Sequence, residues 1–276
     1  AGLGPGCMDL FLGCEPGFMP ETVWYKPCIQ DPAKANLSWN PENPYWQWVL
    51  NTTRQYHRDS QGKCLTIIPD LIEGLDVISE LVGTEELLTY LIDCPQDIHR
   101  LLDQVTDLYF KAFDPLYDIL RDDRNGNGFI AFNAWVPGRT LKTQCDFSAM
   151  ISPDMFAEFV CPYLERQCAR VDFSTYHLDG PGAIRHLPHL LKVPSLTAIQ
   201  WTPGTPNPPP SDRMWWKKIW EPVYASGKSA MVLGCPAKDM EPFLKEFGQK
   251  GTMFTTGVDS ESEARRLIDE SVNWDA

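Results

Sequence analysis

From about Gly62 onward, segments with the pattern of a buried strand alternate with segments that have the spacing of an amphipathic helix. The expected strands lie near Cys64, Phe129, Cys145, Phe173, Thr197, Met231 and Met253. Two parallel strands and the helix between them need about 30 residues, which is close to the spacing of these units. The pattern therefore predicts an α/β fold, and within that class a (β/α)8 TIM barrel whose first unit is missing or disguised.

The alternative to a barrel is a doubly wound open sheet, in which a glycine-rich loop after the first strand commonly binds phosphate. No such loop follows the first expected strand near Cys64. Residues 1–61 differ in character, because aromatic residues stand there among turn sequences such as Pro41-Glu42-Asn43-Pro44. We therefore expect one domain, made of an irregular, aromatic-rich cover over residues 1–61 and a barrel over residues 62–276.

Several helices can be placed more closely. A threonine before an acidic and apolar run starts one at Thr84, and Asp93-Cys94-Pro95 starts a long amphipathic helix that reaches about Leu120. Ser152-Pro153-Asp154 opens another, which continues to Arg170. In the cover, the apolar spacing predicts a helix that ends near residue 58.

The charge of the chain limits its partners. It carries 24 lysines and arginines against 37 aspartates and glutamates, a formal net charge of −13. Without basic clusters or basic helices, such a chain is not suited to nucleic acid or to an anionic membrane surface. No apolar run approaches the roughly 20 residues of a membrane span. We therefore expect neither nucleic acid nor a membrane as a partner.

Nine cysteines are scattered along the chain without a CxxC pair. This spacing fits reduced thiols better than a disulfide framework, and the amino terminus shows no basic segment followed by an apolar stretch. The protein is therefore expected in the cytoplasm. The sequence begins at Ala1 without a methionine, which indicates a fragment or a processed chain.

The run from Thr175 to Gly182 has the pattern of a strand that turns into a helix. The glycines of Gly180-Pro181-Gly182 allow backbone angles that other residues avoid, and the proline stiffens the bend. The turn would hold His177 and Asp179 on one side of a strand's carboxyl end, where parallel α/β folds bind ligands. There an imidazole and a carboxylate can bind a metal, transfer a proton or hold a polar substrate. The alternative is that Asp179 caps the next helix and His177 is a core histidine.

Other polar and aromatic side chains near the expected strand ends would line the same pocket. We expect catalytic roles for His177, Asp179 and Asp70, and substrate contacts from Glu15, Asn133, Trp135, Asp146, Tyr176, Gln200 and Trp201. Glu15 belongs to a tight turn that could aim it at a cavity, and it is otherwise exposed. Asp70 could instead cap a helix, and Cys145 could be a buried filler. His186 and His189 follow the central turn and are expected on the surface.

Four parts of the sequence carry a resemblance to a known family: Ile68-Pro69-Asp70 with Gly74-Leu75-Asp76, Leu81-Val82-Gly83-Thr84-Glu85-Glu86-Leu87-Leu88, His177-Leu178-Asp179-Gly180 and Ser260-Glu261-Ser262-Glu263-Ala264. From about Gly62 to the end, the chain resembles the uroporphyrinogen decarboxylase (URO-D) superfamily. That superfamily contains uroporphyrinogen decarboxylase and the corrinoid-dependent methyltransferases. The resemblance implies a (β/α)8 barrel with a wide pocket at the carboxyl ends of its strands.

In the methyltransferases of this superfamily, a His-x-Cys pair on the same strand and a cysteine near the last strand hold a zinc ion that activates a thiol. His177 matches the histidine, Asp179 stands at the cysteine position, and no cysteine follows the last expected strand. Because zinc accepts carboxylate oxygen, the resemblance implies a zinc site of His177 and Asp179 that Glu15, Asp70 or Cys235 would complete.

In the decarboxylases of the superfamily, amino-terminal arginines pair with the carboxylates of the tetrapyrrole. This chain does not show that segment, and Arg139 and Arg185 are the cations near expected loops that could partly replace it. The resemblance implies an enzyme, either a methyltransferase that acts with a corrinoid protein or a decarboxylase of a small acid or tetrapyrrole. The alternative is a non-catalytic ligand-binding barrel of the same fold, and either could act as a homodimer.

Overall fold

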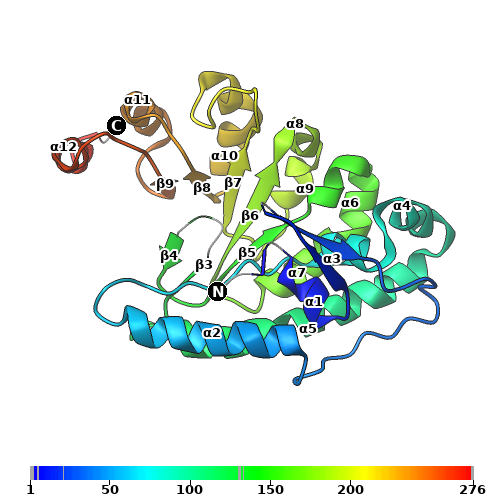
Figure 1. Ribbon diagram of the computed structural model, residues 1–276. Helices are drawn as coiled ribbons and strands as arrows, with labels where there is room; N and C mark the ends of the chain where they lie inside the picture. The colour runs from blue at the N-terminus through cyan, green and yellow to red at the C-terminus, as the bar shows by residue number, and fades with distance from the viewer. Residues whose placement is uncertain (1–2, 5, 21, 130–131, 133, 275–276) are drawn as a thin grey trace. The chain divides into compact units, whose positions relative to one another are not determined.

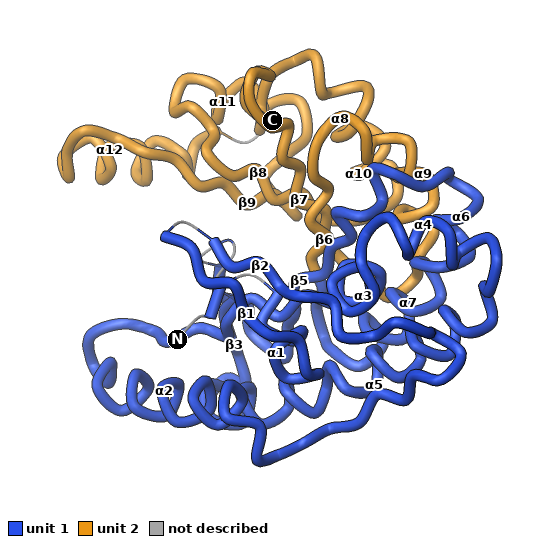
Figure 2. The backbone as a smooth tube through the Cα atoms, turned by 45° about the vertical axis from the view of Figure 1, so that its right-hand side comes forward, with its two compact units in different colours: residues 1–174 blue, residues 175–276 orange. Residues whose placement is uncertain are grey.

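The computed structural model describes residues 3–4, 6–20, 22–129, 132 and 134–274. The chain divides into two compact units, Ala1–Ser174 and Thr175–Ala276 (Figure 2). Both units contain helices and strands, and strand β6 (Phe173–Asp179) spans the boundary in the chain (Figure 1). The α/β class predicted from the sequence is therefore confirmed. In the described part of the chain, no helix has both the length and the apolar character that crossing a membrane requires.

The amino-terminal segment, expected to be an irregular cover, contains regular elements within the first unit. They are α1 (Cys7–Phe11), β1 (Glu15–Phe18), β2 (Val23–Lys26) and α2 (Pro44–Ser60). The strands β1 and β2 form an antiparallel hairpin. Asn43 begins α2, since its side chain accepts hydrogen bonds from the peptide nitrogens of Tyr45 at 2.9 Å and Trp46 at 3.1 Å. The expected end of this helix near residue 58 is confirmed.

Three helices follow in the first unit: α3 (Gly74–Val82), α4 (Thr84–Asp93) and α5 (Pro95–Leu120). The long amphipathic helix predicted from the sequence is α5, with Pro95 in its first turn. Its buried face carries Tyr109, Phe113 and Tyr117, whose rings stack with centroids 5.9 and 6.0 Å apart. Helix α2 packs against α5 (Figure 1).

Two expected strands of the first unit differ from the prediction. Residues 64–68 form no strand; Ile68 makes a single parallel bridge with Phe129, and Leu65 is 60% exposed. Strand β3 (Asn127–Phe129) pairs antiparallel with β4 (Ala134–Val136), in a two-stranded sheet of its own. Among the described residues, neither segment belongs to the parallel sheet that was predicted to include it, although their one bridge to each other is parallel.

The strand expected around Cys145 lies earlier in the chain. It is β5 (Thr140–Gln144), and a 3-10 helix, η2 (Asp146–Met150), follows it. The helix expected over 152–170 is divided into α6 (Pro153–Phe159) and α7 (Cys161–Cys168). Pro162 explains the division, since a proline has no peptide N–H to continue the helical pattern.

The second unit contains the parallel strands β6, β7 (Ala198–Thr202), β8 (Ser229–Val232) and β9 (Thr252–Phe254), in that order. This arrangement confirms the parallel strands predicted near residues 173, 197, 231 and 253. The helical segments are α8 (Gly180–Ala183), η3 (Ile184–His186), α9 (Leu187–Leu190), η4 (Arg213–Trp215), the π-helix η5 (Trp216–Trp220), α10 (Glu221–Ala225), α11 (Ala237–Phe247) and α12 (Glu261–Ser271).

Indole groups hold the proline-rich loop of the second unit. The Nε1 atoms of Trp215, Trp216 and Trp220 donate to the carbonyl oxygens of Pro208, Ser211 and Pro210. Because prolines lack N–H groups, this loop is held through its carbonyl oxygens, which accept the hydrogen bonds. The 3-10 helix η4 that follows the loop is capped by Asp212, whose Oδ1 accepts from the peptide nitrogen of Met214 at 2.9 Å.

A buried lysine anchors β5. The side chain of Lys142 is 4% exposed, and its Nζ lies 2.6 Å from Oδ1 of Asp70 and donates to Oε1 of Gln144. Glu73 lies beside them and accepts from the peptide nitrogen of Gln144 at 2.7 Å. An ammonium group away from water needs such partners, because its desolvation is expensive.

Replacing this lysine should unfold the protein more easily. Lys142→Met leaves Asp70 without its cation, and we expect a loss of about 3 kcal/mol in the free energy of unfolding, measured by urea denaturation. Lys245→Met is the matched control, since Lys245 pairs with Glu241 on the surface of α11. That change should shift stability by less than about 0.5 kcal/mol. Equal effects of the two substitutions would contradict the structural role of Lys142.

Candidate functional site

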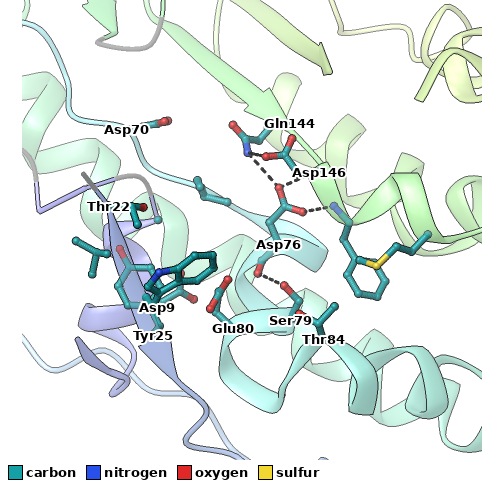
Figure 3. A pocket seen from close by; sticks show the side chains of 16 residues that line it. Asp9, Thr22, Tyr25, Asp70, Asp76, Ser79, Glu80, Thr84, Gln144 and Asp146 are labelled. Atoms are coloured by element: carbon teal, nitrogen blue, oxygen red, sulfur yellow. Dashed lines mark hydrogen bonds between the residues drawn. The ribbon is translucent and has the colours of Figure 1, made fainter. Parts of the chain in front are cut away.

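A cavity of about 490 Å³ in the first unit gathers polar side chains from separate parts of the chain (Figure 3). Its walls come from α1, β2, the segment before α3, α3 itself and the turn after β5. Five acidic residues line it: Asp9, Asp70, Asp76, Glu80 and Asp146. Among the residues that the structure describes, no lysine, arginine or histidine lines this cavity. Its volume falls in the range of small-molecule sites.

Asp76 on α3 holds one wall of the pocket together. Its two carboxylate oxygens accept hydrogen bonds from the peptide nitrogens of Asp146 and Phe147, both at 2.9 Å, and from Nε2 of Gln144 at 3.2 Å (Figure 3). A carboxylate with three donors caps the 3-10 helix η2 and fixes the residues at the end of β5.

Asp9 on α1 is the most deeply buried acid of the pocket. Asp9 is 1% exposed, and its Oδ1 has no hydrogen-bond partner among the described residues. Burial raises the pKa of Asp9 well above its ordinary value, and the nearby carboxylates of Glu80 and Asp76 raise it further. Burial and Asp76 also raise the pKa of Glu80. The acids at this end of the pocket therefore repel one another when ionised.

The β1–β2 hairpin supplies an aromatic wall. Trp24 and Tyr25 of β2 line the cavity, and Trp24 is 66% exposed. Figure 3 shows Tyr25 grouped with Asp9 and Glu80. Burial raises the pKa of Tyr25, with a further contribution from Asp9, so its hydroxyl group stays protonated.

Two thiols lie at the ends of the same hairpin. Cys14 is buried and Cys28 is exposed, and their sulfur atoms are 3.7 Å apart. The hydrogen bond between them lowers the pKa of Cys28 to about 7. The same contact, together with burial, raises the pKa of Cys14. Cys28 therefore carries the more acidic of these thiol groups.

In the second unit, the central turn has the predicted form. β6 ends at Asp179 and α8 begins at Gly180, whose φ angle of 73° lies in the left-handed region that favours glycine. Nδ1 of His177 contacts Oε1 of Gln200, and Nε2 of that amide donates to Oγ1 of Thr202 at 2.8 Å. Because an amide oxygen only accepts, Nδ1 carries the hydrogen, and in the neutral ring Nε2 is the acceptor.

Asp179 occupies the cap position of α8, yet its side chain accepts no capping hydrogen bond from the described backbone. One of its oxygens lies within 4.8 Å of a ring nitrogen of His177. The geometry thus favours the prediction of a shared site over the alternative of a helix cap, while the roles of these residues stay predictions.

Other residues predicted for the site have identifiable surroundings. Asp70 lines the cavity with its carboxylate paired to Lys142, and the cap position of α3 belongs to Glu73. Asp146 also lines the cavity, within the first unit. Glu15 lies on β1 with its side chain 77% exposed, 3.2 Å from Nζ of Lys26. This is the exposed placement that the sequence left as the alternative.

Trp135 lies on β4, where its ring packs on Gly126. The guanidinium carbon of Arg124 lies 4.2 Å from the centroid of this ring. Tyr176 and Trp201 are almost fully buried in the core, whereas Gln200, also buried, contacts His177. Asn133 lies outside the described residues.

Two further residues correct or refine the expectations. His186 was expected on the surface but is buried, with Arg185 Nε donating to its Nε2 at 3.3 Å. Cys235 is buried, its thiol donates to the carbonyl oxygen of Pro236, and burial raises its pKa to about 11.

The sequence did not point to Asp9 or Glu80. Neither follows an expected strand, and they stand on different helices, 71 positions apart in the sequence, so no local pattern connects them. Asp76 stood in a motif that supported the family resemblance, but no role followed from it there. The buried position of Asp9 between two other acids is visible only in the folded chain.

Comparison with known proteins places the fold. No protein-family model matches the sequence, and no curated protein matches it. Among solved structures, a methyltransferase from Methanosarcina mazei is similar, with a TM-score of 0.63 and 12% sequence identity. The match covers 97% of this chain and 78% of the other. At this identity the likeness shows that the two chains share a fold.

Removing the buried acid should change how stability depends on pH. The raised pKa of Asp9 means that, above about pH 4, the folded protein keeps a proton that the unfolded chain releases. Stability from this group is therefore lost as the pH rises toward the folded pKa. We expect Asp9→Asn to raise the melting temperature at pH 7 and to flatten its decline between pH 5 and pH 7.

Asp118→Asn serves as the control, because Asp118 is exposed on α5 and pairs only loosely with Arg121, at 3.8 Å. An unchanged pH dependence in Asp9→Asn, measured by thermal unfolding, would show that Asp9 is ionised in the folded protein.

Proposed function

We propose that the protein is an enzyme of the URO-D superfamily with a (β/α)8 barrel, and that it transfers a methyl group between a small molecule and a corrinoid carried by a partner protein. The observation that carries the proposal is the pairing of His177 and Asp179 at the carboxyl end of β6, in a chain whose fold resembles that of a methyltransferase. Ligands of parallel α/β folds bind at such strand ends.

The residues of the second unit suit a metal or a proton transfer. The contact with Gln200 fixes which nitrogen of His177 carries the hydrogen, as a second-layer partner does for metal-binding histidines. Asp179 is exposed and is not used as a helix cap. These two residues would hold a zinc ion, which would supply a Lewis acid that favours the thiolate form of an acceptor.

The donor set differs from a thiolate-rich zinc site, because no described cysteine joins His177 and Asp179 in a group of ligand atoms within 4.8 Å of one another. Catalytic zinc commonly has three protein ligands. Metal analysis of the purified protein is therefore the direct test of this part of the proposal. Without a metal, the same pair would act by proton transfer, with Nε2 of His177 as the base.

A decarboxylase of an anionic tetrapyrrole fits the first unit less well. Its pocket is lined by five acidic residues and by no described basic one, whereas a polycarboxylate substrate needs cations. Of the two arginines expected to help, Arg139 pairs with Asp114 and stacks on Phe113. The acidic pocket therefore favours methyl transfer over decarboxylation.

Loss of His177 should abolish turnover. The test reaction is demethylation of free methylcobalamin, in place of the corrinoid protein, with a thiol acceptor. We expect His177→Ala to reduce the rate about 100-fold or more and to remove bound zinc. His189→Ala, on α9, is the control and should keep both. If the wild-type protein neither binds zinc nor demethylates methylcobalamin, the non-catalytic binding protein becomes the better explanation.

Asp179 should matter for activity more than for folding. A carboxylate that capped α8 would stabilise the protein by about 1 kcal/mol, so its removal would lower the melting temperature. Since no capping bond is formed, we expect Asp179→Ala to leave the melting temperature nearly unchanged and to reduce turnover strongly. A clear loss of stability with unchanged turnover would contradict the site assignment.

A further inference from the structure

The cavity of the first unit has an excess of negative charge. The charge of Asp70 is balanced by Lys142, and the carboxylate of Asp76 accepts three hydrogen bonds. Asp9 and Glu80 line the same cavity, and no basic residue stands among its described lining side chains. A concave site of this kind attracts a cation.

The arrangement does not suit a small metal ion. A metal needs several oxygens around one point, at about 2.0 to 2.6 Å. Within the described part of the first unit, no three potential ligand atoms of histidine, cysteine or acidic side chains lie within 4.8 Å of one another. The acids are instead spread over a cavity of about 490 Å³, which fits an organic molecule.

The walls of the cavity also carry aromatic rings. Trp24, which is 66% exposed, and Tyr25 come from β2 to the same cavity as Asp9 and Glu80. A methylated ammonium group has few or no N–H donors, so proteins recognise it by aromatic faces and by nearby negative charge. This combination is the one found here.

Asp9 supplies an independent indication of a ligand. Its Oδ1 is buried at the wall of the cavity and has no described hydrogen-bond partner. A buried acceptor of this kind is unfavourable unless something compensates it. Burial chiefly, and then the carboxylates of Glu80 and Asp76, raise the pKa of Asp9, and a bound positive charge would relieve the repulsion among these acids.

We propose that this cavity binds an organic cation, a methylated amine or quaternary ammonium compound, with Trp24 and Tyr25 providing the aromatic surface. Glu80 and Asp9 provide the charge, Asp9 by releasing its proton to solvent as the cation binds. The inference goes beyond the proposed function, because it assigns a ligand to the cavity of the first unit and is tested by binding alone.

The test compares choline with 3,3-dimethyl-1-butanol, a neutral molecule of nearly the same shape, by calorimetric titration of the whole protein. We expect choline to bind at least about 10-fold more tightly, a difference that reports the charge. Asp9→Asn and Glu80→Gln should each weaken choline binding about 10-fold or more. Glu42→Gln, an exposed position before α2, should leave it unchanged.

A second pair of variants tests the aromatic wall of the cavity. Trp24→Ala should weaken choline binding by about 5-fold or more, whereas Trp48→Ala, at an exposed tryptophan of α2, should have no effect. Both variants remove an exposed ring, so folding is expected to survive each change.

Equal binding of choline and its neutral analogue would overturn the inference, as would choline binding that Asp9→Asn and Glu80→Gln leave intact. Absence of choline binding at about 50 mM would overturn it too. Failure here is distinct from failure of the proposed function. Choline binding without methylcobalamin turnover would support the cation site and refute the proposed methyltransferase. Methylcobalamin turnover without choline binding would support the methyltransferase and refute the cation site.

Discussion

The carboxylate of Asp76 determines how the pocket is built. It accepts hydrogen bonds from two consecutive peptide nitrogens after β5 and from the side chain of Gln144. Helix α3 and the end of β5 are thereby tied together, although they are about 70 residues apart in the chain. Because the residue is 8% exposed, water cannot readily replace these bonds, and the position of Asp146 at the cavity depends on them.

Strand β5 itself is held by a polar network rather than by an apolar face. Lys142 pairs with Asp70, and Glu73 accepts from the backbone of Gln144. Such a network specifies one arrangement, because each group would be unfavourable without its partner. The same network reaches the cavity, because Asp70, the partner of Lys142, is one of the acids that line it.

The sequence predicted the elements that have local signals and missed those that depend on distant partners. The helix α5 has regular apolar spacing with Pro95 at its start, and the turn after Asp179 has a glycine where the backbone needs one. Strand β5 was misplaced because its residues are polar, and they are buried only through partners elsewhere in the chain. Residues 64–68 look like a strand, yet they make a single bridge. His177 and Asp179 could be proposed from their spacing, whereas Asp9 and Glu80 come together only by folding.

The crowding of acids around Asp9 has a consequence for the evolution of this chain. Buried acids that repel one another lower the stability of the folded protein, so a selection for heat resistance alone should soon replace them with neutral residues. A chain selected for folding has no reason to keep them. In variants recovered from such a selection, the carboxylates that are lost first would therefore identify the part of the cavity that is maintained at the expense of stability.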